Sequence, residues 1–199
     1  MRRVLTATLA VALSAVLAAC STSDEPAAAP TTDASVGAQS STPPEEQWKN
    51  QDDIMFAQMM VPHHEQAIAM ADTLLAKDGV DPRVVDLATQ IKAAQAPEIE
   101  QLNVWLDDWG FTASGDTHPM SHGDGMMTEA DMQALADADG ASAGRIFLEQ
   151  MIVHHQGAID MARAEVDAGV FAAAVTMAQM IIDTQTAEIT TMEDLLATM

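Results

Sequence analysis

From residue 48 onward, apolar residues recur at helical spacing, and turn signals divide this part of the chain into long helical segments. The first predicted helix ends at Lys77-Asp78-Gly79. Asp81-Pro82 then begins the second helix with an N-cap and a first-turn proline. Trp109-Gly110 ends the second helix. One residue conflicts with this pattern: Pro62 should kink the first helix and leave the carbonyl group of Gln58 without its usual partner.

The second half of the chain repeats this arrangement. Thr128 is a predicted N-cap of a short helix in the central connection. A third long helix is predicted over about residues 142–167. Gly169 ends that helix, and a fourth runs to the C-terminus. Two helical hairpins of this length bury their apolar stripes best against each other. The predicted fold is therefore all-α: a four-helix bundle of two duplicated hairpins, with a short extra helix between them.

The duplication can be read directly in the sequence. The segment FAQMMVPHHEQAIAMA begins at Phe56, and FLEQMIVHHQGAIDMA begins at Phe147, 91 residues later. The second arms also match, at an offset of 90, because each carries a QxxE motif. Those motifs are Gln95 with Glu98 and Gln185 with Glu188.

Each repeat carries an adjacent histidine pair flanked by methionine. The paired histidines are His63, His64, His154 and His155, and the flanking methionines are Met60, Met70, Met151 and Met161, with Met59 as a further member of the first copy. Residues four or seven apart on a helix share a face, so each pair should lie beside thioether groups. We expect one histidine of each pair to point into the bundle and the other toward its edge. The QxxE motif of the partner arm is predicted to orient an inward imidazole by hydrogen bonding.

The central connection adds a third cluster. Within ten residues it contains His118, Met120, His122, Met126 and Met127. Glycine and proline interrupt this segment, so its methionines are not explained by a core helix. Histidine and thioether ligands without cysteine favour copper, especially Cu(I), with Ag(I) as its mimic. Zinc is disfavoured because its sites usually use cysteine, histidine and carboxylate. Gln150 replaces the methionine equivalent to Met59, so the first copy should bind more tightly.

The N-terminus predicts export. Arg2 and Arg3 precede an apolar run that is too short to span a membrane, and the run closes on Leu17-Ala18-Ala19-Cys20, which resembles a lipobox. Residues 1–19 would be a lipoprotein signal peptide, and Cys20 would carry the lipid. An ordinary secretory signal with an incidental cysteine is the alternative. Residues 20–47 would form a flexible Ala/Ser/Thr/Pro tether to a bundle domain over residues 48–199. We expect the protein to be anchored to the outer face of the cell membrane, or on the periplasmic side if there are two membranes.

The charge of the mature chain limits its partners. Arg2 and Arg3 are two of the eight basic residues, so six remain after Cys20 against 30 acidic residues, a net charge of −24. A surface this acidic disfavours nucleic acid, which needs a basic face. The expected partners are a metal ion, the membrane through the lipid on Cys20, and a protein that donates or accepts the metal. Cys20 is the single cysteine, so no thiol remains for a metal site.

Alternative functions stay open on the sequence alone. A di-iron carboxylate bundle would need Glu-x-x-His motifs, and no glutamate lies three residues before any histidine. The second hypothesis is a structural or interaction module in which histidine and methionine only fill the core. A metal oxidase or reductase is the third. No catalytic residue is predicted.

The two histidine repeats, the HGDGMM segment and the QxxEI arms together resemble a bacterial family known as domain of unknown function 305. The resemblance covers about residues 50–198. It implies a ferritin-like helical bundle that is commonly exported, and some members are implicated in copper or silver binding and tolerance. It also implies that the paired histidines and their methionines are the ligands, followed by the histidines and methionines of the central connection.

Overall fold

A computed structural model describes residues 48–113 and 125–199, and all regular structure in these two ranges is helical. The first hairpin consists of α1 (Gln51–Leu75) and α2 (Pro82–Trp109). The second consists of α4 (Gly140–Ala168) and α5 (Ala172–Leu196), and the short α3 (Glu129–Asp137) lies between the hairpins along the chain. The predicted all-α bundle of two duplicated hairpins with a short extra helix is confirmed.

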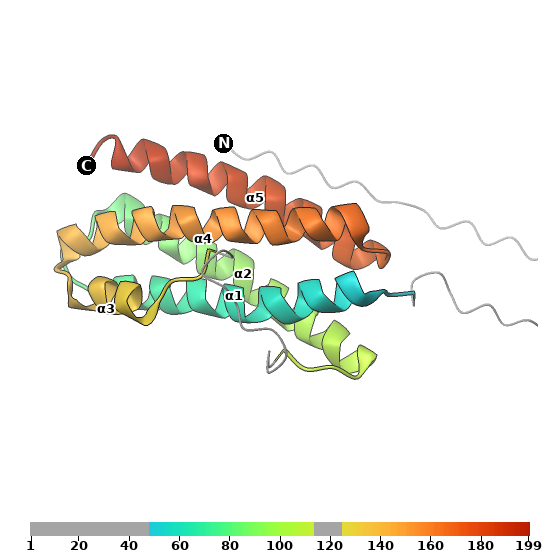
Figure 1. The fold of residues 1–199 in the computed structure, drawn as a ribbon. Coiled ribbons are helices and arrows are strands. Elements are labelled where there is room, and N and C mark those ends of the chain that lie inside the picture. Colours follow the sequence, from blue (N-terminus) through green and yellow to red (C-terminus); the bar gives the residue numbers. More distant parts are fainter. Residues whose placement is uncertain (1–47, 114–124) are drawn as a thin grey trace, which may run out of the picture. The chain divides into compact units, whose positions relative to one another are not determined.

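Helices α1 and α4 form the centre of the bundle. Each packs along its own hairpin partner, and the two hairpins meet chiefly where α1 contacts α4 (Figure 1). Helices α2 and α5 lie outside and contact each other only sparsely. Helix α3 contacts both α1 and α4, so it covers part of the seam between them.

The helix ends follow from local chemistry. Asp81 caps α2 by accepting from the backbone N–H of Arg83 at 2.9 Å, and Pro82 occupies the first turn. Gly110 ends α2 with φ of 79°, a left-handed conformation that favours glycine. Thr128 begins α3 as the N-cap of a capping box with Asp131. These boundaries agree with the sequence predictions.

The start of α5 is capped by a residue of the other hairpin. Phe171, its N-cap residue, makes no side-chain cap hydrogen bond. Instead, Oδ1 of Asp53 on α1 accepts from the backbone N–H groups of Val170 and Phe171 at 3.0 and 2.9 Å. The amide of Asn50 also donates to the carbonyl oxygen of Ala168 at 2.7 Å. The beginning of α1 is therefore fastened to the turn between α4 and α5.

Both helices of the first hairpin contain a proline. Helix α1 runs through Pro62 as one element, and α2 likewise contains Pro97. The side chain of Gln58 donates to the carbonyl oxygen of Thr112 at 2.9 Å, so this turn of α1 also touches the end of the first hairpin.

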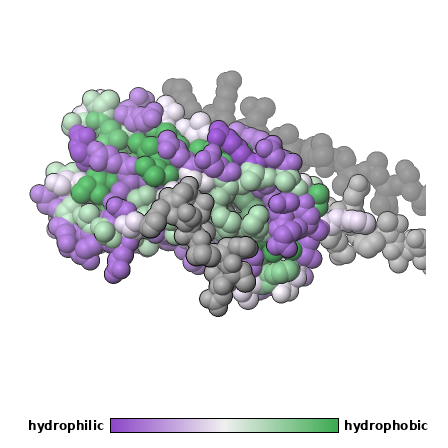
Figure 2. All heavy atoms as spheres, in the orientation of Figure 1, coloured by the Kyte–Doolittle hydropathy of each residue, from purple (hydrophilic) through white to green (hydrophobic). Residues whose placement is uncertain are grey.

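The apolar core is divided into two clusters. One surrounds Met70, Phe147 and Met151, and the other surrounds Phe56, Met60 and Leu102. Between them along α1 and α4 lie the paired histidines. Hydrophilic residues cover most of the outer face shown in Figure 2, with hydrophobic residues in patches among them. None of the helices in the described ranges is both long enough and apolar enough to cross a membrane.

Candidate metal centre

All four paired histidines are buried in the middle of the bundle. Their exposed fractions are 0 % for His63, His64 and His155, and 1 % for His154. Neither member of a pair reaches the edge, which differs from the expectation. Gln95 on α2 and Gln185 on α5 are also buried, at 2 % and 3 % exposure. We call these six side chains the histidine belt. A polar layer inside an apolar core is costly unless its atoms find partners or a ligand.

The inner histidines meet across the seam between the hairpins. The ring centroids of His63 on α1 and His154 on α4 are 3.8 Å apart, with 40° between the ring planes. Burial is the main cause that lowers the pKa of His154 well below its ordinary value, and the neighbouring His63, His155 and His64 lower it further. His154 is therefore a neutral imidazole at physiological pH, which is the form that binds metal.

The outer histidines are held by carboxylates of the second arms. Nε2 of His64 lies 2.8 Å from Oε2 of Glu98, and Nε2 of His155 lies 2.7 Å from Oε2 of Glu188. An ionised carboxylate only accepts hydrogen bonds, so each Nε2 donates. In the neutral ring this arrangement leaves the lone pair on Nδ1, the usual effect of an outer hydrogen bond on a ligand histidine. The glutamates of the two QxxE motifs thus contact one histidine of each pair, but this is the outer ring and not the inward imidazole that the sequence predicted.

Several nitrogen atoms in the belt have no hydrogen-bond partner. They include Nδ1 of His64, Nδ1 of His155 and both ring nitrogens of His154. The side-chain oxygen and nitrogen of Gln95 are also without partners. A buried polar atom left in this condition costs about 1–3 kcal/mol. The belt thus contains lone pairs that a bound cation could engage.

The predicted methionines separate into three locations. Met60 and Met151 are fully buried in opposite apolar clusters, on either side of the histidine belt. Met70 packs in the cluster that contains Met151. Met59 and Met161 lie elsewhere, in a groove between α1 and α4 that opens to solvent.

Only the last part of the central cluster falls within the described residues. His118, Met120 and His122 lie outside them, as does Cys20. Met127 packs against an apolar cluster, so this methionine does have a packing role. Its backbone N–H donates to Oε1 of Gln66 at 2.7 Å, and its carbonyl oxygen accepts from Nε2 of Gln66 at 2.9 Å. Gln66 was not singled out in the sequence, although it lies one helical turn beyond His63.

At Gly125 the chain passes close to the backbone of α4, beside Val153 and Gly157. Gly125 has φ of 77°, and a Cβ atom on it would lie 2.7 Å from the carbonyl oxygen of Val153 and 3.0 Å from the Cα of Gly157. Gly125 and Met127 are therefore held against α4 and α1 respectively. Met126 lies between them and is half-buried.

The side chains in and beside the histidine belt carry imidazole and thioether groups. Within the described ranges, no three side chains of histidine, cysteine, aspartate or glutamate converge in a metal-binding arrangement, the paired histidines included. Met60 and Met151 are the buried methionines that flank the paired histidines along α1 and α4. Thioether and imidazole ligands select Cu(I) over harder cations.

The fold and the belt define a class: duplicated helical hairpins with a histidine pair at the seam. The chain belongs to the family described as domain of unknown function DUF305, whose sequence model matches residues 53–196. A crystallised DUF305 fragment from Deinococcus radiodurans is 32% identical, with a TM-score of 0.68. The match covers 75% of this chain and 98% of the fragment, so this bundle folds as an independent unit in a relative.

Other relatives extend the comparison. A DUF305 protein from Streptomyces coelicolor, itself predicted to be secreted, is 34% identical over 73% of this chain and 91% of that protein, with a TM-score of 0.67. CopM in its Cu(I)-bound form is 30% identical over 73% of this chain and 96% of CopM, with a TM-score of 0.62. CopM has also been crystallised with Cu(II) and with silver. An uncharacterised protein, L153, from Acanthamoeba polyphaga mimivirus is 39% identical over 57 residues. That match covers 29% of this chain and only 37% of the viral protein.

Proposed function

We propose that this protein is exported, anchored through a lipid on Cys20, and binds Cu(I) for buffering, tolerance or transfer to a partner protein. The observation that carries the proposal is the histidine belt: four buried histidines, three of which (His64, His154 and His155) have unpartnered ring nitrogens, placed between two buried methionines. A relative that folds in the same way binds Cu(I), Cu(II) and silver. Copper is the cargo in this proposal, and the chain supplies its ligands.

The histidines, glutamates and methionines of the site have different roles in binding the ion. His63 and His154 lie against each other where the two hairpins meet, so an ion bound through their ring nitrogens would be shared by both halves. Glu98 and Glu188 fix the outer rings and keep Nε2 occupied, which directs Nδ1 toward a ligand role. Met60 and Met151 supply soft donors and exclude water. The export and anchoring steps rest on the N-terminal sequence and on the secreted character predicted for the Streptomyces relative.

The primary test is competition for Cu(I). Residues 48–199 are titrated with Cu(I) against a chelator of known affinity, beside a variant with His63→Gln, His64→Gln, His154→Gln and His155→Gln. Glutamine keeps a polar side chain of similar length but has no imine nitrogen. We expect the variant to bind the belt ion at least about 100-fold more weakly, a larger loss than outer-shell substitutions give. Met177→Leu, at a buried methionine that is not among the proposed ligands, is the control. Equal affinity of the wild-type chain and the quadruple variant would remove the histidine belt from the proposal.

The same titration separates cargo binding from a purely structural role. A ligand that binds only the folded state stabilises it by about 2.7 kcal/mol at 100 times its dissociation constant. We therefore expect the melting temperature of the wild-type domain to rise with Cu(I), and that of the quadruple variant to respond far less. A melting temperature that does not change at a saturating Cu(I) concentration would favour the structural module instead.

Replacing the orienting carboxylates is expected to weaken Cu(I) binding without removing a ligand. Glu98→Gln together with Glu188→Gln should lower the Cu(I) affinity by about 10–100-fold, because the outer rings lose a charged acceptor that fixes their orientation. The measurement is the same chelator competition. Glu100→Gln, on the exposed side of α2, is the control and should leave the affinity unchanged. If the double variant and the control behave alike, the carboxylates do not position the rings for metal.

A further inference from the structure

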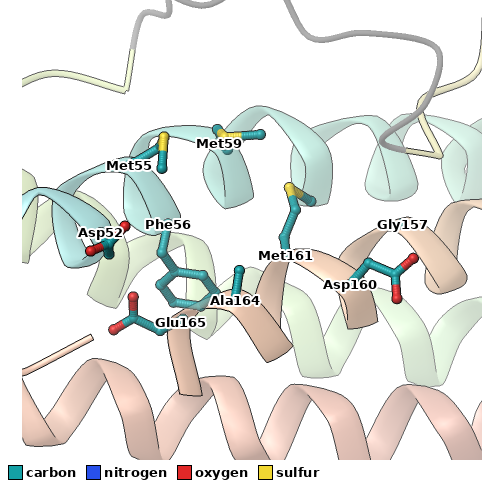
Figure 3. A pocket seen from close by; sticks show the side chains of 9 residues that line it. All are labelled: Asp52, Met55, Phe56, Met59, Gly157, Asp160, Met161, Ala164 and Glu165. Atoms are coloured by element: carbon teal, nitrogen blue, oxygen red, sulfur yellow. The ribbon is translucent and has the colours of Figure 1, made fainter. Parts of the chain in front are cut away.

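A methionine-lined groove lies on the seam between α1 and α4, apart from the histidine belt. It has a volume of about 340 Å³. Met55 and Met59, four residues apart on α1, face Met161 on α4, and the side chain of Met161 points toward α1 (Figure 3). All three methionines are half-buried, so their thioethers are reachable from solvent. Met55 was not predicted as a ligand from the sequence.

The charges around the groove favour a cation. Asp52 and Asp160 are among its nine lining residues, and none of those nine is a lysine or an arginine. Asp160 accepts from Nη1 of Arg163 at 3.1 Å, so Asp52 is the lining aspartate that has no ion-pair partner among the described residues. Phe56 forms part of its wall (Figure 3). Three soft donors beside the carboxylate of Asp52 would attract a soft cation, whereas a purely apolar ligand would gain nothing from the acidic residue.

The internal duplication provides a built-in comparison. At an offset of 91 residues, Ile146 and Gln150 stand in place of Met55 and Met59. The two aspartates are likewise replaced by alanine, since Ala143 corresponds to Asp52 and Ala69 to Asp160. Only Met70, the counterpart of Met161, keeps the thioether.

The duplicated position is filled rather than open. Helix α3 packs there, and its Leu135 is fully buried in the same cluster as Met70 and Phe147. Nε2 of Gln150 also donates to the carbonyl oxygen of Asp131 at the start of α3, at 2.8 Å. One copy of this surface is thus apolar and covered, while the other is methionine-lined, acidic and open. An open groove with soft donors is therefore not an unavoidable consequence of the fold.

We infer that the groove is a second soft-metal site, formed by the thioethers of Met55, Met59 and Met161 and independent of the histidines. It binds Cu(I), or Ag(I) as its mimic, by thioether coordination. This inference rests on the proposed cargo being a soft metal, but it uses none of the residues of the histidine belt. Because the groove opens to solvent and the belt is buried, the groove is the site that an incoming ion meets first.

The test uses residues 48–199 labelled with ¹³C at the methionine methyl groups and titrated with Ag(I). We expect the methyl signals of Met55, Met59 and Met161 to shift, both in the wild-type chain and in the variant with all four histidines replaced by glutamine. The combined change Met55→Leu, Met59→Leu and Met161→Leu should reduce the Ag(I) stoichiometry by one while the Met60 and Met151 signals still shift. Met180→Leu, an exposed methionine on α5, is the control and should change nothing.

The outcomes separate the two sites. Shifts confined to Met60 and Met151 would overturn the groove site and leave the histidine belt standing. Shifts confined to the groove methionines would support the groove and remove the belt. An unchanged stoichiometry in the triple leucine variant, confirmed as folded by circular dichroism, would also overturn the groove. Leucine nearly conserves the volume of methionine, so the triple variant is expected to fold.

Discussion

Replacing Gly140 by alanine is expected to lower the free energy of unfolding by about 3 kcal/mol or more, because a Cβ atom there has no space. Gly140 begins α4, and its added Cβ would lie 1.9 Å from the carbonyl oxygen of Asp78 and 2.8 Å from the carbonyl carbon of Gly79. Both are backbone atoms of the turn between α1 and α2. The turn or the helix start would have to move, which would separate the two hairpins at this end.

Gly144 provides the control within the same helix. A Cβ atom there would lie 3.5 Å from Cε of Met199, which is an ordinary contact with a flexible side chain. Gly144→Ala should therefore leave the stability unchanged or raise it by up to about 1 kcal/mol, since alanine favours helix over glycine. Urea unfolding followed by far-ultraviolet circular dichroism measures both variants. Similar losses of stability in both would show that the approach of Gly140 to the turn is not what matters.

The second large effect concerns pH and Glu165. Glu165 is buried on α4 at 1 % exposure, and its pKa is raised to about 8. Burial is the main cause, followed by hydrogen bonding and charge from the neighbouring Asp53, and then the charge of Asp52. Neither oxygen of Glu165 makes a hydrogen bond of good geometry, which agrees with burial as the dominant cause. Asp53 itself is fully buried and accepts from the backbone N–H groups that begin α5.

The sign of the pH effect follows from the direction of the shift. The folded state holds the proton on Glu165 up to about pH 8, whereas the unfolded chain releases it near the ordinary value of 4.5. The stabilising contribution is therefore complete below the unfolded pKa and is lost as the pH rises through the folded one. Each pH unit between them costs about 1.4 kcal/mol, so the loss from pH 4.5 to above 8 is on the order of 3–5 kcal/mol.

Glu165→Gln isolates this contribution. Glutamine keeps the shape and cannot ionise, so the variant should lose much less stability than the wild-type chain between pH 5 and pH 9. It should also be the more stable of the two at pH 9. Denaturant unfolding of residues 48–199 at several pH values is the measurement, with the exposed Glu193→Gln as control. Parallel pH profiles for the wild-type chain and Glu165→Gln would contradict the assignment.

Local chemistry made most of the fold predictable. Helix ends are marked in the sequence by Asp81-Pro82, Gly110 and Thr128. Side-chain caps and backbone conformational freedom set these ends, and both depend on residues that are neighbours in the sequence. Pro62 does not end α1, which is continuous over Gln51–Leu75. Phe171 carries no cap of its own. Its partner Asp53 lies more than a hundred residues away, so no local signal could reveal it.

The candidate site was predictable in its members but not in its arrangement. The repeat pointed to the histidines and to Glu98 and Glu188, since a motif copied twice at a fixed offset is visible in one chain. The contact between His63 and His154 depends on how the two hairpins meet, which no spacing specifies. Met55 was missed because its counterpart is Ile146, so the repeat itself gave no signal there. The covering of that counterpart by α3 is likewise a tertiary fact.

The hydrogen bonds between the start of α1 and the turn between α4 and α5 affect how the domain responds to a pulling force. A pull on the chain ahead of Trp48 is directed into the first turn of α1. There Asn50 and Asp53 are hydrogen-bonded to Ala168, Val170 and Phe171 of the other hairpin. Before α1 could unwind under tension, those bonds would have to break, so the load is shared by both hairpins from the outset. Under the proposed anchoring through Cys20, this arrangement would let the whole bundle resist the force rather than one helix.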